Sequence, residues 1–252
     1  MLAAEIQKYD LQEESILQDP VNVKLLEALT RFADLLTIYG YNVRICSKGS
    51  LLKLSETPNK KKYQMTAYFE QWSNWIDPGP SREPIEDIEL KCLKKALHHY
   101  GLKASDDFLR TIAKDQIVEV YGDEMIQLYR SLSFFQITGY SLLDIIVHEF
   151  YHLWERSTKA IESTIADCNA VLDGNLPLKA FTISRQIIRE TNQGGVVQEP
   201  FVNRAILANF INIGSLVSVN DDMIHGVARG VICTSTAEII AMGDDAVNIQ
   251  FI

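Results

Sequence analysis

Residues 116–146 read QIVEVYGDEMIQLYRSLSFFQITGYSLLDII, and this stretch is the best guide to the fold of the chain. It opens with two short runs rich in Val, Ile and Tyr, Gln116–Tyr121 and Met125–Tyr129, which are separated by Gly122, Asp123 and Glu124. β-Branched and aromatic runs on either side of a turn containing Gly and Asp are typical of a β-hairpin. The stretch therefore predicts two antiparallel strands that lead directly into helical sequence.

The segments after this hairpin predict helices first and strands afterwards. Ser141 is expected to begin a helix, because Asp144 stands three residues later and completes a capping-box-like pair. The expected helices are Ser141–Trp154, Thr158–Leu172 and Leu178–Glu190. The expected strands, rich in Val and Ile, are Arg204–Ile213, Leu216–Val219 and Ile224–Thr234. A strand pair followed by helices and then by antiparallel strands indicates an α+β fold, not an alternating βαβ fold.

The first 84 residues predict a smaller region of mixed α/β structure. Apolar residues at helical spacing over Val21–Ile38 favour a helix that ends at Gly40, and Tyr41–Leu54 favours two short strands. Asp77–Pro84 holds three of the seven prolines, which is the composition of a linker. A helix over Ile85–Tyr100 follows. We therefore expect an N-terminal α/β region over 1–84, a linking helix over 85–113 and an α+β domain over 114–252.

The composition limits the classes of partner that this protein is expected to bind. The formal net charge of -9 disfavours nucleic acid and anionic membrane surfaces, because both are bound through basic faces. The N-terminus lacks the charged and apolar regions of a signal peptide, and no apolar run reaches the length of a bilayer span. The four cysteines form no CxxC pair, which is typical of reduced thiols. We expect a cytoplasmic protein that binds neither nucleic acid nor membrane.

The hairpin and the residues after it resemble the PAS domain family. The sequence FQITGYSL at residues 135–142 is close to the pattern FxxITGYSxxEL that is common in that family. Residues 220–238 are similar to its closing hairpin and the exit from that hairpin. The resemblance covers roughly residues 114–240. It implies a PAS-like five-stranded antiparallel sheet with flanking helices.

The resemblance also implies a function and a binding cavity. A PAS-like domain senses a signal by binding a small ligand or a protein partner, and it relays the change through a dimer or inter-domain interface. Four side chains are expected to line or approach the central cavity: Phe135, Ile137, Tyr140 and Trp154. The resemblance implies a homodimer and identifies no cofactor.

A second motif, HEFYH at residues 148–152, leads to a different hypothesis. HExxH on a helix is the signature of zinc metallopeptidases, in which two histidines four residues apart bind the metal and the glutamate acts as general base. The enzyme alternative assigns His148 and His152 as ligands, Glu149 as catalytic base, and Glu162 or Asp167 as the third ligand. Haem or zinc binding through the two histidines of a PAS-like domain is a further alternative.

The surroundings of this motif favour the PAS-like interpretation over the peptidase. Thr158 and Val171 stand where two metallopeptidase families place their third ligand. On one continuous helix from Ser141 to Trp154, the two histidines would lie on the polar side, opposite a broad apolar arc. We therefore predict a sensing and regulatory protein, with a zinc-dependent peptidase as the alternative.

Overall fold

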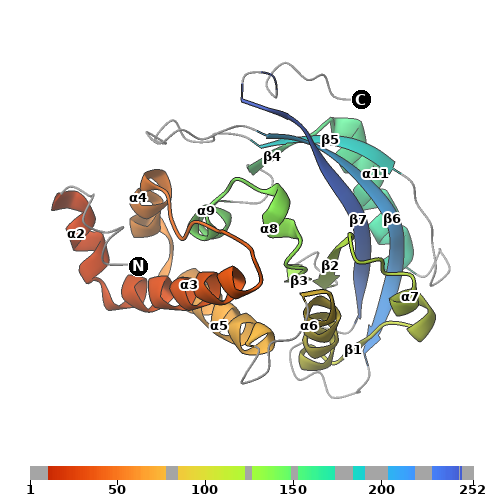
Figure 1. Ribbon diagram of the computed structural model, residues 1–252, viewed down its shortest axis with the longest axis horizontal. Helices are drawn as coiled ribbons and strands as arrows, with labels where there is room; N and C mark the ends of the chain where they lie inside the picture. Colours follow the sequence, from red (N-terminus) through yellow and green to blue (C-terminus); the bar gives the residue numbers. More distant parts are fainter. Residues whose placement is uncertain are drawn as a thin grey trace. The chain divides into compact units, whose positions relative to one another are not determined.

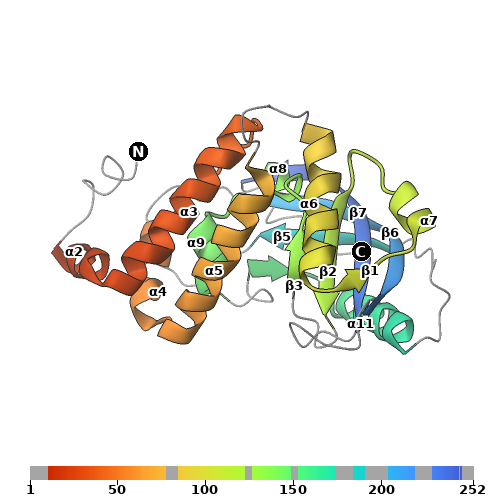
Figure 2. The ribbon, with the colours of Figure 1, turned by 90° about the horizontal axis from the view of Figure 1, so that it is seen from below.

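The computed structural model divides the chain into two compact units (Figures 1 and 2). Unit 1 contains residues 1–81, 139–154 and 191–202, and unit 2 contains residues 82–138, 155–190 and 203–252. The structure describes residues 11–77, 85–122, 127–148, 153–173, 184–190, 204–218, 229–243 and 245. The units do not follow the three parts expected from the sequence, because unit 1 takes in a segment from the middle of the chain.

Unit 1 is built from helices in its described residues. These helices are α2 (Leu11–Gln18), α3 (Pro20–Ile38), α4 (Lys48–Glu56), α5 (Asn59–Ile76) and α9 (Leu142–Val147). Helices α3 and α5 pack through aromatic rings: the Phe32 ring centroid lies 5.2 Å from that of Phe69 and 4.5 Å from that of Trp72. The predicted end of α3 is confirmed, since Gly40 has a φ of 86°, which suits glycine after a helix.

The prediction of two strands over Tyr41–Leu54 was wrong, and the described residues 11–77 contain helices and no strand. Residues 41–47 have no regular secondary structure, and α4 begins directly after them. A capping box starts this helix: Ser47 Oγ accepts from the backbone N–H of Ser50, and Ser50 Oγ accepts from that of Ser47. Short apolar runs are ambiguous between strand and helix, and this cap decides the outcome.

The single helix predicted over Ser141–Trp154 is also interrupted. The capping box of Ser141 and Asp144 is confirmed, but α9 ends at Val147, and His148 has extended backbone with φ −97° and ψ 151°. Residues 154–155 form a short strand, β4 (Trp154–Glu155). The first turn of α9 binds the loop that precedes α4: the backbone N–H groups of Leu142 and Leu143 donate to the carbonyls of Arg44 and Ile45, both at 2.9 Å.

Unit 2 contains a curled antiparallel sheet, and the chain is therefore a mixed helix-and-sheet protein (Figure 1). Within the described residues the sheet has seven strands, in the order β3-β2-β7-β6-β5-β4, with β1 paired to β6 off this path. The remaining strands are β1 (Leu102–Lys103), β2 (Ile117–Gly122), β3 (Gln127–Arg130), β5 (Ser184–Glu190), β6 (Arg204–Ser218) and β7 (Arg229–Met242). The predicted antiparallel pairing of the opening strands is confirmed for β2 and β3.

Helices cover both faces of this sheet. On one side, Tyr129 of β3 donates a hydrogen bond to a carbonyl of α6 (Ile85–His99), and Gly214 of β6 faces Phe108 of α7 (Asp106–Arg110). On the other side, Gln186 of β5 donates to the Ala160 carbonyl of α11 (Thr158–Leu172). We call this second side the α11 face; the short helix α8 (Phe134–Ile137) follows β3.

The C-terminal strands differ in extent from the prediction. The helix expected over Leu178–Glu190 is a strand from Ser184 onward, because those residues pair with β6 along its length. The two strands expected over Arg204–Val219 form one strand, β6, with an irregularity between Phe210 and Asn212. The helices predicted over Ile85–Tyr100 and Thr158–Leu172 are confirmed as α6 and α11. The turn predicted at 220–222 lies outside the described residues.

Candidate functional site

The candidate site is a polar network on the α11 face of unit 2. Side chains two residues apart on a strand point to the same side, so Glu119 and Tyr121 of β2 share this face. The β2–β3 register places Arg130 opposite Glu119 and Gln127 opposite Tyr121. Strand pairing thus brings a carboxylate, a phenol, an amide and a guanidinium together.

Short hydrogen bonds connect these four side chains. Arg130 Nε donates to Glu119 Oε1 at 2.8 Å, and Arg130 Nη2 lies 2.6 Å from the same oxygen in the ion pair. Gln127 Nε2 lies 3.1 Å from both Glu119 Oε1 and the Tyr121 hydroxyl. The side chains of the ion pair are 5% and 13% exposed, so this pair is largely removed from water. The Arg130 guanidinium also lies 4.0 Å from the ring centroid of Phe134, within cation–π range.

Burial and neighbouring charge shift the pKa of the groups in this network. Burial first, and the Glu119 carboxylate second, raise the pKa of Tyr121 far above its ordinary range. Burial lowers the pKa of Arg130, but Glu119 and Tyr121 outweigh it and raise the value overall. Arg156 lies near the same groups, and burial lowers its pKa. At neutral pH the phenol of Tyr121 is therefore a hydrogen-bonding group, not an anion.

Two thiols lie further along the same face. Cys233 of β7 stands directly opposite Glu119 in the β2–β7 register. Cys168 of α11 packs with Cys233 in a buried cluster that also contains Val171, Ile213 and Val231. Both cysteines are free thiols, 2% and 3% exposed. The α11 face thus carries a charged network over β2 and β3 and a thiol pair under α11.

The aromatic residues predicted to line a cavity divide between the two units. Phe135 and Ile137 belong to α8 in unit 2, where Phe135 is buried and its ring lies 5.6 Å from that of Phe134. Tyr140 and Trp154 belong to unit 1, where their rings meet edge to face at 5.4 Å. The Tyr140 hydroxyl donates to the Leu153 carbonyl.

The residues of the HExxH hypothesis are described only in part. His148 stands in extended backbone after α9, where its Nδ1 lies 3.3 Å from Lys53 Nζ. Glu149 and His152 lie outside the described residues. Glu162 is exposed on α11, in the other unit. In the part of the chain that the structure describes, no three His, Cys, Asp or Glu side chains gather in a way that could hold a metal ion.

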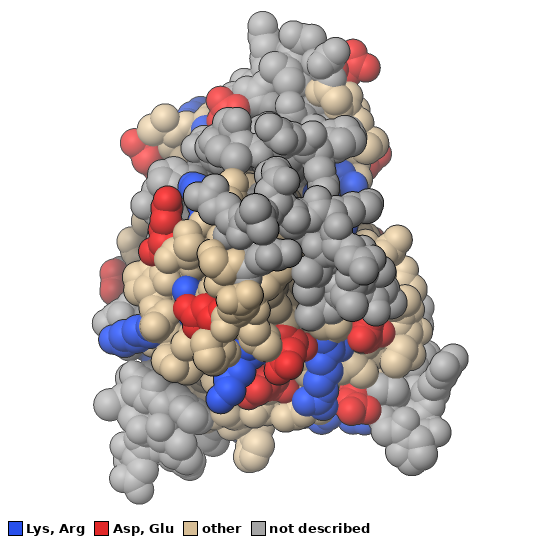
Figure 3. Space-filling model, turned by 90° about the vertical axis from the view of Figure 1, so that its left-hand side faces the viewer, with Lys and Arg blue, Asp and Glu red and all other residues tan. Residues whose placement is uncertain are grey.

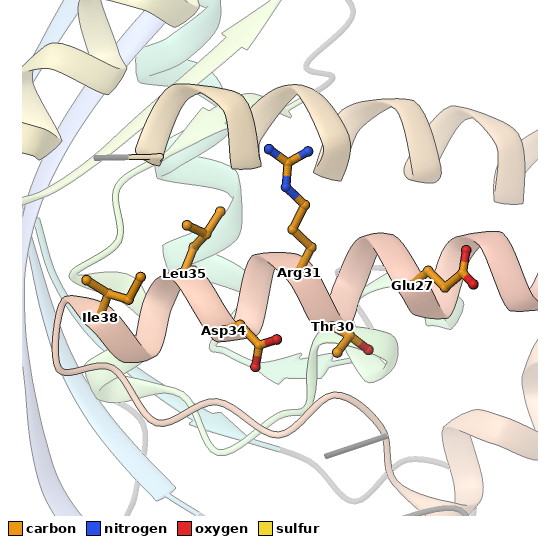
Figure 4. A pocket seen from close by; sticks show the side chains of 6 residues that line it. All are labelled: Glu27, Thr30, Arg31, Asp34, Leu35 and Ile38. Atoms are coloured by element: carbon orange, nitrogen blue, oxygen red, sulfur yellow. The ribbon is translucent and has the colours of Figure 1, made fainter. Parts of the chain in front are cut away.

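Two shallow surface hollows lie elsewhere. One, of about 420 Å³, runs along α3 and is lined by Glu27, Thr30, Arg31, Asp34, Leu35 and Ile38 (Figure 4). The other, of about 430 Å³, runs along α6 and is lined by Leu90, Lys91, Lys94, Lys95 and His98. Acidic and basic side chains are interspersed over the described part of the face in Figure 3. No described helix is long and apolar enough to cross a bilayer.

Comparison with known proteins returns no match: no family model, no curated protein and no solved structure is significantly similar to this chain. The function of the site is therefore inferred from the chemistry of its own residues. Sequence reasoning missed Glu119, Tyr121 and Arg130, although a signal was present. Glu119 and Tyr121 alternate with Val118 and Val120 in a strand pattern, which places two polar side chains on one face of a strand.

Proposed function

We propose that this chain is a cytoplasmic sensor or regulatory protein in which unit 2 acts as a PAS-like domain. It binds a small ligand or a protein partner against the α11 face of the sheet, and the change is relayed through a dimer or inter-domain interface. The observation that carries the proposal is the buried network of Glu119, Tyr121, Gln127 and Arg130 on that face.

The order of elements in unit 2 supports a PAS-like domain. An opening strand pair, β2 and β3, leads to helices α8 and α11, and three antiparallel strands close the sheet. This is the order that the resemblance implies for residues 114–240, of which 139–154 and 191–202 belong to unit 1. β2 pairs with β7, so the first and last of these strands lie side by side within the sheet.

The energetics of the ion pair favour a role in recognition. Removing a carboxylate and a guanidinium from water costs several kcal/mol per ion, and apolar side chains of similar size often give equal or greater stability. Such a pair is therefore weak evidence for stabilisation alone. A ligand that hydrogen-bonds to Glu119, Arg130 or Tyr121 would use the same polar groups for specificity.

The test compares what binds to two purified proteins. One is the unaltered chain, and the other carries Glu119→Gln and Arg130→Met, which remove both charges but keep side-chain volume. We expect a small molecule or a protein to be recovered with the unaltered chain and lost from the variant, as measured by mass spectrometry after denaturation. The matched control, Asp107→Asn, removes one side of an exposed ion pair on α7 and should retain the bound species. Recovery of nothing specific from the unaltered chain would contradict the proposal.

Metal content and oligomeric state are measured on the same preparation. We expect a homodimer by sedimentation and no stoichiometric zinc by elemental analysis. Zinc that is present in the unaltered chain and lost in His148→Ala would overturn the sensor proposal in favour of the metallopeptidase alternative.

A further inference from the structure

We propose that Cys168 and Cys233 form an intramolecular disulfide when a hydroperoxide oxidises them, and that this bond fastens α11 to β7. The inference concerns a modification site, and it stands whether or not the α11 face binds a ligand. It rests on the position of the two thiols, on their chemical asymmetry and on the separation of the other two cysteines.

The two thiols meet between the sheet and the helix that covers it. Cys168 of α11 and Cys233 of β7 belong to one buried cluster, so the two thiols lie between the helix and the sheet. Val171, Ile213 and Val231 surround them. A disulfide has a sulfur–sulfur distance of about 2.05 Å, so its formation requires the two thiols to approach each other within this packed cluster.

The other cysteines are not positioned to compete. Cys92 is buried on α6, which contacts β3 from the opposite side of the sheet. Cys46 belongs to the loop before α4 in unit 1. Within unit 2, the fold therefore places Cys233 beside Cys168, although the two are 65 residues apart in sequence (233 − 168).

The pair is also chemically asymmetric. The neighbouring Cys233 thiol lowers the pKa of Cys168, although burial acts in the opposite direction. The Cys168 thiol, together with burial, raises the pKa of Cys233. Cys168 is thus the thiol that loses its proton first, and the thiolate is the form that attacks peroxides.

The reaction balances with a hydroperoxide as oxidant. The Cys168 thiolate attacks the terminal oxygen of ROOH; the O–O bond breaks, ROH leaves after taking up a proton, and Cys168 becomes a sulfenic acid. The Cys233 sulfur then attacks the Cys168 sulfur, the S–O bond breaks, and the hydroxyl group of the sulfenic acid leaves as water with the proton of Cys233. Two thiols and one hydroperoxide give one disulfide, one ROH and one water.

The decisive experiment uses the unaltered chain. The protein is treated with hydrogen peroxide, alkylated in denaturant and digested with trypsin without reduction. We expect two of the four thiols to resist alkylation, with a loss of about 2 Da in intact mass. The tryptic peptide of residues 160–179 should be linked to that of residues 230–252, and a reducing agent should release both.

Single substitutions test the order of the two steps. In Cys233→Ser, dimedone should trap a sulfenic acid on Cys168, while in Cys168→Ser the remaining Cys233 should react little. Cys46→Ser and Cys92→Ser are matched controls that should leave the crosslink unchanged. Four alkylatable thiols after oxidation, or crosslinks that involve Cys46, Cys92 or a second chain, would overturn the proposal. The mapping needs no variant, so its result holds even if a substitution impairs folding.

Discussion

At the scale of single residues, the main feature of this protein is a charged pair held away from water. Glu119 and Arg130 form a hydrogen-bonded ion pair, and their side chains are 13% and 5% exposed. Asp107 and Arg110 form an ion pair at 3.2 Å, but with 60% and 77% of those side chains exposed. The chain thus contains both a buried pair and an exposed pair, which allows a controlled comparison.

Glu119→Gln should destabilise the fold far more than Asp107→Asn. The first change leaves the Arg130 charge buried without its carboxylate, which typically costs about 3–5 kcal/mol. The second removes a pair that water already screens, with a cost below about 1 kcal/mol. Urea unfolding followed by circular dichroism measures both values. Similar losses of stability in the two variants would show that Arg130 is not held as the structure describes.

Tyr121 should make the protein lose stability in alkali. Its folded-state pKa is raised by burial and by Glu119, whereas the unfolded chain titrates near 10. Its contribution is fully present below the unfolded value and is lost as the pH rises above it, because only the unfolded state releases the proton. Urea unfolding at a series of pH values should show that, above about pH 10, the free energy of unfolding declines less steeply in Tyr121→Phe than in the unaltered chain.

The absorbance of tyrosinate gives an independent check on Tyr121. In native protein below the unfolding pH, the unaltered chain and Tyr121→Phe should titrate the same number of tyrosines. One additional tyrosinate in the unaltered chain would mean that Tyr121 ionises within the fold.

At the scale of elements, two glycines of the sheet allow close approach, one to a neighbouring strand and one to helix α7. A Cβ atom added at Gly230 of β7 would lie 2.5 Å from the backbone oxygen of Tyr121 in β2. One added at Gly214 of β6 would lie 2.7 Å from two ring carbons of Phe108. A backbone atom within a paired strand cannot move alone, whereas a phenylalanine ring can rotate or shift.

Gly230→Ala should therefore cost more than Gly214→Ala. We expect a loss of about 2–3 kcal/mol for the first, since the β2–β7 pairing must spread, and a smaller loss for the second. Thermal and urea unfolding of the two variants measure the difference. If Gly214→Ala proved the more damaging substitution, the β2–β7 register of the structure would be in question.

At the scale of the whole molecule, the two units are not consecutive in sequence. The loop before α4 binds a segment nearly a hundred residues away: Ser47 Oγ donates to Asp144 Oδ1 at 2.8 Å, and Arg44 Nη2 donates to the Gly139 carbonyl at 2.9 Å. Asp144 also accepts from Ser141 through its other carboxylate oxygen. The loop before α4 therefore depends on residues 139–154 for its hydrogen-bond partners.

A fragment of residues 1–81 should consequently fold poorly by itself. The carbonyls of Arg44 and Ile45 and the hydroxyl of Ser47 lose their partners in α9. We expect broad, weakly cooperative thermal unfolding by circular dichroism. Joining residues 139–154 to the fragment through a flexible linker should sharpen the transition, and equal unfolding curves for the two proteins would contradict this division into units.

Local spacing was enough to predict several helices and the opening strand pair. The helical periodicity of α3, α6 and α11 and the turn-forming sequence after β2 are patterns of residues that lie within a few positions of one another. The capping box of Ser141 and Asp144 was predicted for the same reason. The length of α9 was not predicted, because the helix ends at Val147, within the range that was expected to be helical.

The elements that were missed depend on distant partners. Residues 184–190 become a strand because β6 pairs with them, although their spacing also suits a helix. Residues 48–56 become a helix, and their Ser47 cap is held by Asp144 from α9. In the first case a contact distant in sequence overrides local propensity, and in the second it supports the local cap of Ser47 and Ser50.

The candidate site shows the same division between sequence and tertiary structure. The alternation of Glu119 and Tyr121 in one strand and the opening strand pair follow from the sequence alone, since each depends on neighbouring residues. Only the tertiary structure places Arg130 against Glu119 and Cys168 against Cys233. The physical reason is that burial and partner choice come from strand register and from the packing of α11 on the sheet, which join residues far apart in the chain.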